Sequence, residues 1–178
     1  MKKIVFTFGS IAGLIVGLIG FVTFPMLVKG TINFKYGAYV GFSTMIVALS
    51  LVFFGVKSYR DNHLGGTITF WKASQVGGLI ALVASFIYAA GWEVSLHYII
   101  PDFVDQYTAQ CIANAKADNV SPEKMERVLK QVEDVRWIYK YPILRFGMTM
   151  LELLVPVGVV MTLASAGLLR KKELLPAR

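Results

Sequence analysis

Four long apolar segments constrain this chain more than any other feature of its sequence. Each has the length, about 20 residues or more, that a helix needs to cross some 30 Å of hydrocarbon. A soluble domain would not carry so many, and the composition, with 56% hydrophobic and 16% charged residues, agrees. We therefore predict an all-α integral membrane protein, a single domain over residues 1–178 in which four transmembrane helices form a bundle, with spans at about 4–28, 37–56, 76–100 and 143–169.

The basic residues near the ends of these spans indicate their orientation, because such residues stay on the cytoplasmic side during insertion. They gather before the first span, between the second and third, and after the fourth (Lys2, Lys3, Lys57, Arg60, Lys72, Arg170, Lys171 and Lys172). These three places share one side of the membrane. We predict a multi-pass protein with both termini in the cytoplasm.

The segment 101–142, between the third and fourth spans, has helical signals of its own. Ser121-Pro122-Glu123 combines an N-cap residue, a proline suited to the first turn and an early acidic charge. Apolar residues then recur at helical spacing (Met125, Val128, Leu129, Val132 and Val135), and a shorter apolar set precedes them (Val104, Tyr107, Cys111 and Ile112). We predict two helices joined by a turn at Asp118-Asn119. They would form an extracytoplasmic cap, which is either a plain cover or a docking surface for an envelope component.

Small residues recur every four positions in two of the spans. Gly9, Gly13 and Gly17 do so in the first span, and the third span has an equivalent set (Gly77, Ala81, Ser85 and Ala89). Such a stripe lets another helix approach closely in lipid. We expect these faces to pack within one bundle, with homodimerisation as the alternative.

Four ionisable residues lie within the predicted spans: Glu93, His97, Arg145 and Glu152. Their helices are antiparallel, so the four side chains can meet at a similar depth on the outer side of the midplane. Charges in hydrocarbon are costly unless they are paired or hydrated. The cluster is either structural, with Arg145 neutralising a carboxylate, or a proton or cation site. The third alternative is a metal-dependent hydrolase, for which Glu93 and His97 would be only two ligands.

The connection between the second and third spans carries Lys57, Arg60, His63 and Lys72. We expect residues 57–73 to lie along the membrane interface, with a turn at Gly65-Gly66 and Thr69 capping the next helix. In that setting the four basic side chains would bind lipid headgroup phosphate. The alternative is that they act only as topology signals.

Other features limit the chemistry available to this chain. Pro156, four residues after Glu152, lacks a backbone N–H and should kink the fourth span. Cys111 is the only cysteine, so an intrachain disulfide is impossible, and no zinc spacing or phosphate loop is present. We therefore expect no metal or cofactor. We also expect no nucleic acid partner, because the membrane topology explains the net charge of +7.

Several short motifs resemble a known bacterial membrane family. The chain is similar to it at Tyr59-Arg60-Asp61-Asn62, Gly65-Gly66-Thr67-Ile68-Thr69-Phe70, Lys72-Ala73, Pro101-Asp102-Phe103, Leu151-Glu152 and Pro156-Val157-Gly158. The family is the one described as domain of unknown function 4199. The resemblance covers about residues 1–172 and implies a four-helix inner-membrane protein. It implies no catalytic residues.

These observations leave two leading hypotheses for the function. The first is a non-enzymatic accessory or structural protein that associates with itself, membrane lipid or an envelope complex, because small-residue stripes are present and no catalytic motif is assembled. The second is a small proton- or cation-coupled carrier that uses Glu93 and Glu152.

Overall fold

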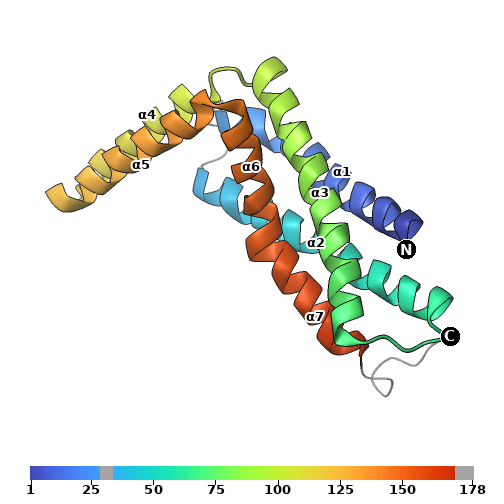
Figure 1. Ribbon diagram of the computed structural model, residues 1–178. Coiled ribbons are helices and arrows are strands. Elements are labelled where there is room, and N and C mark those ends of the chain that lie inside the picture. The colour runs from blue at the N-terminus through green and yellow to red at the C-terminus, as the bar shows by residue number, and fades with distance from the viewer. Residues whose placement is uncertain (29–33, 171–178) are drawn as a thin grey trace.

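The computed structural model describes residues 1–28 and 34–170, and the regular structure in this part of the chain is entirely helical (Figure 1). The elements are α1 (Lys2–Val28), α2 (Phe34–His63), α3 (Phe70–Tyr98), α4 (Phe103–Ala117), α5 (Pro122–Lys140), α6 (Pro142–Leu153), the π-helix η1 (Leu154–Val159) and α7 (Val160–Leu169). Within the described residues, four helical stretches are long and apolar enough to cross a membrane: Lys2–Leu27, Tyr39–His63, Phe70–Tyr98 and Pro142–Leu169. The predicted helical, multi-pass architecture is confirmed at this level.

Two helices continue beyond the predicted spans at their basic ends. Helix α2 continues to His63 and α3 begins at Phe70, so within the expected interfacial stretch 57–73 the connection between helices is only residues 64–69. The difference arises because a hydropathy boundary falls at the first charge, whereas a helix continues through Lys, Arg and Asn. Gly65 and Gly66 do make the predicted turn, with φ of +62° and +86°. Thr69 caps α3, since its Oγ1 accepts a hydrogen bond from the Lys72 N–H at 3.3 Å.

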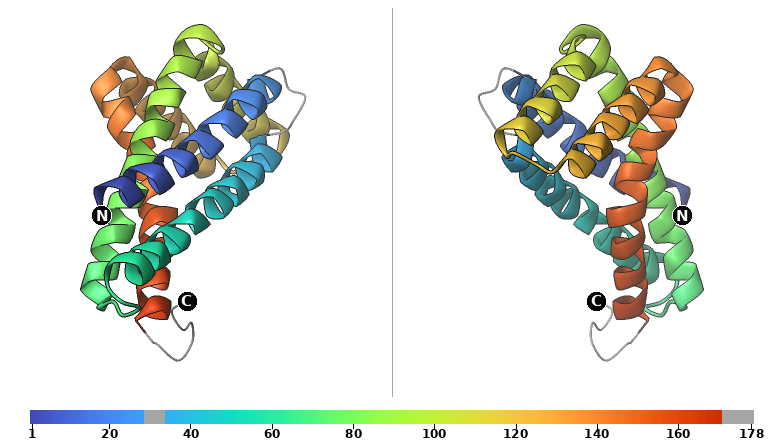
Figure 2. Two further views of the ribbon diagram at one scale, coloured as in Figure 1. Left: turned by 90° about the vertical axis from the view of Figure 1, so that its right-hand side faces the viewer. Right: turned by 90° about the vertical axis from the view of Figure 1, so that its left-hand side faces the viewer.

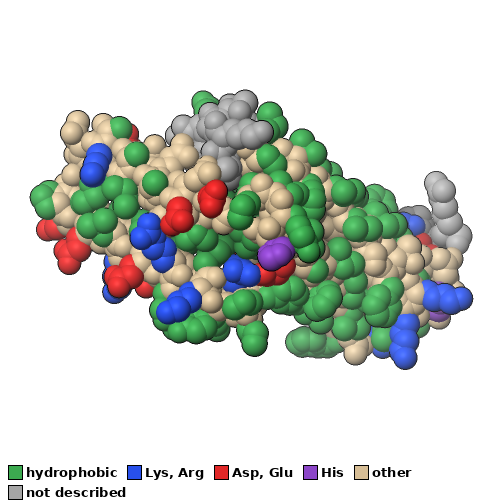
Figure 3. Space-filling model, turned by 90° about the horizontal axis from the view of Figure 1, so that it is seen from above, with side chains coloured by type: hydrophobic (Ala, Val, Ile, Leu, Met, Phe, Trp, Pro, Cys, Tyr) green, Lys and Arg blue, Asp and Glu red, His purple; other side chains and the backbone are tan. Residues whose placement is uncertain are grey.

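Helix α3 forms the centre of the bundle and packs against α1, α2, α6, η1 and α7. Its buried face meets those of its neighbours in a core of branched and small residues that includes Leu49, Val52, Val76, Ile80 and Leu153. Many large apolar side chains point outward instead, as in Phe6, Leu18, Val47, Phe86 and Val160, all more than half exposed. Figure 3 shows mainly hydrophobic side chains over the middle of one face. Such a surface suits hydrocarbon and would be a liability in water.

The bundle is splayed at one end. Helix α2 packs against η1 and α7 toward the other end, while α2 and α6 diverge toward the end that carries α4 and α5 (Figure 2). The α4–α5 hairpin overlies the space between α1, α2 and α6 in that view. The predicted pair of helices and their turn are confirmed, with Asn119 at a φ of +46°. Ser121 occupies the predicted N-cap position and Pro122 the first turn, but the Ser121 side chain makes no capping bond.

The fourth span is interrupted where the sequence predicts a kink. Its α-helical hydrogen bonding gives way to the π-helix η1, which contains Pro156. Pro156 has no N–H to offer the carbonyl of Glu152 four residues earlier, and a wider turn accommodates this defect. Gly158 lies in the same turn, and a Cβ there would be 3.1 Å from the Cβ of Ala81. Helix α3 therefore packs closely against the widened turn. The predicted basic residues Lys171 and Lys172 lie outside the described residues.

Candidate functional site

A cavity of about 550 Å³ lies at the splayed end, beneath the α4–α5 hairpin. Helices α1, α2, α3, α4, α5 and α6 all contribute to its walls. Most of the lining is apolar or aromatic, and the polar or reactive side chains among the described lining residues are few (Thr23, Thr44, Tyr88, Trp92, Tyr107, Cys111, Tyr139 and Glu152). The cavity exists because α2 and α6 diverge here and the hairpin bridges the gap without filling it.

Glu152 is the one charged residue among the described residues that line this cavity. No hydrogen bond or ion pair joins its carboxylate to any side chain that the structure describes, and the side chain of Lys35 is not among these. Tyr88, Tyr107 and Tyr139 line the same cavity. The Glu152 side chain is exposed to the space of the cavity. An acid within a spanning helix that faces a cavity with no described cation beside it marks a candidate functional site.

Aromatic rings form the wall of the cavity next to α3. The indole of Trp92 meets the rings of Phe24 and Phe103 edge-on, with centroid distances of 4.4 Å and 4.9 Å. Phe103 stacks on Tyr107 at 5.7 Å and lies 6.0 Å from the ring of Tyr139. These contacts join α1, α3, α4 and α5. Edge-to-face pairs of this kind are favourable beyond their buried area.

The sequence analysis did not single out this aromatic wall. One signal was available, because Tyr88 and Trp92 are four residues apart on α3, and Phe103 and Tyr107 are four apart on α4. Each pair therefore shares a helix face. That the two faces meet depends on the hairpin folding back over the bundle, which no local pattern indicates.

Two tyrosines of the hairpin have altered acidity. Burial raises the pKa of Tyr139 to about 12, and the nearby carboxylate of Glu152 adds to this effect. Burial also raises the pKa of Tyr107, and Cys111 and Glu152 contribute. Both phenols stay protonated at neutral pH and can present an O–H to the cavity.

The predicted cluster of four ionisable side chains is divided between two places. Arg145 forms a two-point ion pair with Glu93, in which its Nε lies 2.8 Å from Oε1 and its Nη2 bonds Oε2. Its Nη1 donates to the carbonyl oxygen of Tyr139 at 3.0 Å. His97 lies beside this pair in a second hollow of about 430 Å³. Glu152 is in the main cavity and has no bond to any of the three.

The geometry gives no metal centre in the part of the chain that the structure describes. No group of three or more His, Cys, Asp or Glu side chains is placed there to hold an ion. Glu93 is occupied by Arg145, and His97 contacts Tyr98 edge-on at 4.6 Å.

The small residues of the first and third spans lie at contacts within one copy of the chain. A Cβ at Gly9 would be 2.7 Å from the Cβ of Val83, and one at Gly13 would be 2.7 Å from the carbonyl oxygen of Ala84. A Cβ at Gly17 would meet no atom within 4 Å, and one at Gly91 would be 4.0 Å from the Cα of Gly17, so the packing is looser here. The third-span set is buried against α2, η1 and α7 or within the core (Gly77, Ala81, Ser85 and Ala89).

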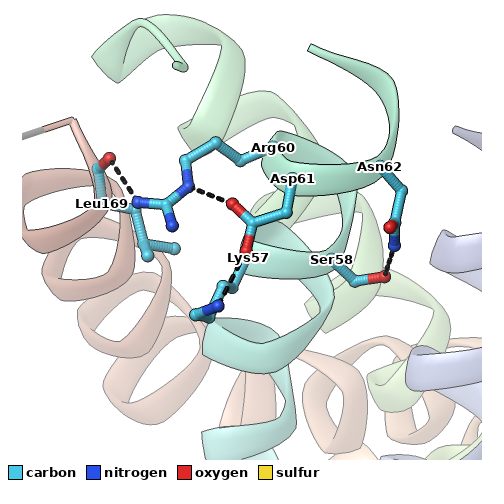
Figure 4. Close-up of polar contacts among 6 residues, drawn as sticks. All are labelled: Lys57, Ser58, Arg60, Asp61, Asn62 and Leu169. Atoms are coloured by element: carbon cyan, nitrogen blue, oxygen red, sulfur yellow. Dashed lines mark hydrogen bonds and ion pairs between the residues drawn. The ribbon is translucent and has the colours of Figure 1, made fainter. Parts of the chain in front are cut away.

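The four basic residues proposed for lipid headgroups lie at the opposite end and have different surroundings. Arg60 is fully buried, and Figure 4 shows its guanidinium between Asp61 and the end of α7. Its Nε donates to Asp61 Oδ1 at 2.6 Å and its Nη1 to the Leu169 carbonyl at 3.4 Å. Lys57 binds the other carboxylate oxygen of Asp61 at 2.7 Å. Lys57 and Lys72 are half-buried, and His63, which stacks on Tyr59, is exposed.

A comparison with known families gives one match. The model of the family described as protein of unknown function (DUF4199) matches residues 7–171, which include the four spanning stretches and the hairpin. No curated protein and no solved structure matches the chain. The predicted family resemblance is therefore confirmed.

Proposed function

We propose, from the premise that this chain belongs to the DUF4199 family, that it is a non-enzymatic membrane protein whose cavity binds an amphiphilic molecule. The observation that carries this proposal is the cavity itself. Its volume of about 550 Å³ lies within the range of roughly 300–1,000 Å³ that small-molecule sites occupy. A mostly apolar lining with a few polar groups is also typical of such sites.

The surroundings of the cavity favour a ligand with an apolar part. Its walls include apolar side chains of the spanning helices α1 and α2, among them Val16, Ile19, Leu27 and Met45. A ligand would reach it from the bilayer or from the side of the hairpin. Among the accessory roles open to this chain, association with membrane lipid or a lipid-like molecule is therefore favoured over association through the small-residue stripes, which contain close contacts between helices of one copy.

A cavity-filling substitution tests the proposal. Gly41 lines the cavity, and a Cβ there would meet no atom within 4 Å, so Gly41→Leu should occupy the space without a clash. Gly167→Leu is the matched control, since Gly167 is equally open but lies outside the cavity. Native mass measurement after gentle extraction should show a bound molecule in the wild type and in Gly167→Leu, and loss of it in Gly41→Leu. Equal retention by all three proteins, or by none, would contradict the proposal.

The orientation and the membrane are part of the same proposal. We place both termini in the cytoplasm and the hairpin outside the bacterial inner membrane, on the strength of the basic residues at the span ends. Cys111 is a natural reporter because it lies in α4 and is the only cysteine. An impermeant thiol reagent should label it in intact cells whose outer membrane has been permeabilised. Labelling only after the inner membrane is broken would reverse the orientation.

A proton- or cation-coupled carrier is the second candidate, and the unpaired carboxylate of Glu152 in the cavity favours it. Glu93 is no longer part of this candidate, because Arg145 already neutralises it. A carrier should show pH-dependent flux in liposomes that Glu152→Gln reduces while the protein stays folded. Unchanged flux in that variant would remove the carrier from consideration.

A further inference from the structure

The described lining of the cavity beneath the hairpin contains an acidic side chain but no basic one. Glu152 brings a negative charge, and no Lys, Arg or His is among the described residues that line it. The guanidinium of Arg145, in the same helix as Glu152, is directed to Glu93 and to the Tyr139 carbonyl. The carboxylate of Glu152 therefore has no counter-ion among the described side chains. It carries a proton, is hydrated, or takes its positive charge from an occupant of the cavity.

The remaining polar lining also suits a positive charge. Trp92 and three tyrosines, Tyr88, Tyr107 and Tyr139, line the same cavity as Glu152 and contribute their rings to its wall. The faces of indole and phenol rings attract cations, and groups of such rings recognise quaternary ammonium. An anionic headgroup would meet the carboxylate unfavourably at the same place.

We propose that the cavity selects an amphiphile whose headgroup is an ammonium, with Glu152 as its counter-ion and the aromatic wall around it. This inference rests on the proposed function and names the ligand class for the same site. The apolar half of the lining, at α1 and α2, receives the hydrocarbon part of the molecule. The ammonium belongs either to a membrane lipid headgroup or to a free amphiphilic amine, and the two sources have the same chemistry at Glu152.

Cys111 allows the proposal to be tested on the full chain, because this only cysteine lines the cavity. Labelling by N-ethylmaleimide, a neutral reagent, is followed in nanodiscs of phosphatidylglycerol, which has no ammonium group. Three ten-carbon amphiphiles are added in turn: decyltrimethylammonium, decanol and decanoate. A parallel set of nanodiscs contains phosphatidylethanolamine in place of part of the phosphatidylglycerol and tests the lipid source.

The wild type should be protected from labelling by decyltrimethylammonium or by phosphatidylethanolamine at concentrations about tenfold lower than decanol requires. Decanoate should protect least. Glu152→Gln should remove most of this preference, whereas Glu152→Asp should keep part of it. The matched control is Glu133→Gln, since Glu133 is an exposed acid of α5 outside the cavity, and it should behave as the wild type.

Other outcomes would contradict either the ammonium proposal or the proposed function. Equal protection by decanol and decyltrimethylammonium, or a preference that survives in Glu152→Gln, would overturn the ammonium proposal while leaving the cavity as a binding site. Protection by none of the amphiphiles or lipids would overturn the proposed function, and the ammonium proposal with it.

Discussion

Arg145, at the start of α6, holds the carboxylate of Glu93, in the last third of α3, through two guanidinium nitrogens. The third nitrogen binds the carbonyl of Tyr139, in the last turn of α5. One side chain thus joins α3, α6 and the hairpin. Arg145 therefore neutralises Glu93, while Glu152 lies in the separate main cavity.

We expect Glu93→Gln to destabilise the protein by about 2 kcal/mol, because it leaves a partly buried guanidinium with a weakened partner. The free energy of unfolding in mixed micelles is the appropriate measurement. Asp105→Asn is the control, since Asp105 and Arg136 are 3.8 Å apart and both largely exposed, and its effect should stay below about 1 kcal/mol. Similar losses in both variants would show that the Glu93 pair has no special structural role.

Gly13 and Gly17 should differ sharply when each is replaced by alanine. A Cβ at Gly13 would lie 2.7 Å from the Ala84 carbonyl oxygen, so α1 must move away from α3, at a cost of about 1–3 kcal/mol. A Cβ at Gly17 meets nothing within 4 Å, and alanine there should leave stability unchanged or raise it slightly through helix propensity. Thermal unfolding of the two variants in the same detergent checks this order. If Gly17→Ala were the more damaging variant, the α1–α3 packing described above would be incorrect.

Arg60→Gln should destabilise the protein by about 2 kcal/mol, since it removes a fully buried charge that contacts Asp61 and the last turn of α7. Lys57→Gln, in the same ion-pair group, should cost less than about 1 kcal/mol because the lysine is partly exposed and four residues from Asp61. The measurement is again unfolding in mixed micelles. Should lipid binding fall while stability stays unchanged in Arg60→Gln, a headgroup role would replace this structural one.

The stability of the hairpin should depend on pH in the alkaline range. With the pKa of Tyr139 raised to about 12 in the folded protein and near 10 in the unfolded chain, only the unfolded chain loses the proton between these values. The contribution of the buried neutral phenol is therefore complete below pH 10 and declines as the pH rises toward 12.

Between pH 9 and pH 11 this loss should amount to about 1 kcal/mol, and Tyr139→Phe should remove it. Tyr141→Phe changes an exposed tyrosine beside the same helix and serves as the control. Unfolding at the two pH values gives both comparisons. The same pH dependence in Tyr139→Phe and in the wild type would assign the effect to another group.

Much of the secondary structure could be predicted locally. The spans are visible because each apolar segment must satisfy its own backbone hydrogen bonds in lipid, which leaves a helix as the one solution for a single segment. The hairpin could be predicted because Ser121-Pro122 and Asp118-Asn119 mark boundaries through their own backbone preferences. The end of α2 could not be predicted in this way, because Lys57 to His63 remain helical beyond the hydrophobic part of the span.

The sequence by itself determined that this chain is a set of long apolar helices with a helical excursion, because length, hydropathy and helix spacing are properties of each segment alone. Only the tertiary structure decided which carboxylate Arg145 neutralises, that Gly13 rather than Gly17 is tightly packed, and that Arg60 is inside. The cavity around Glu152 is likewise a product of the tertiary structure alone. It is formed where α2 and α6 diverge under the hairpin, and a helix face specifies which side is apolar but not the angle at which another helix crosses it.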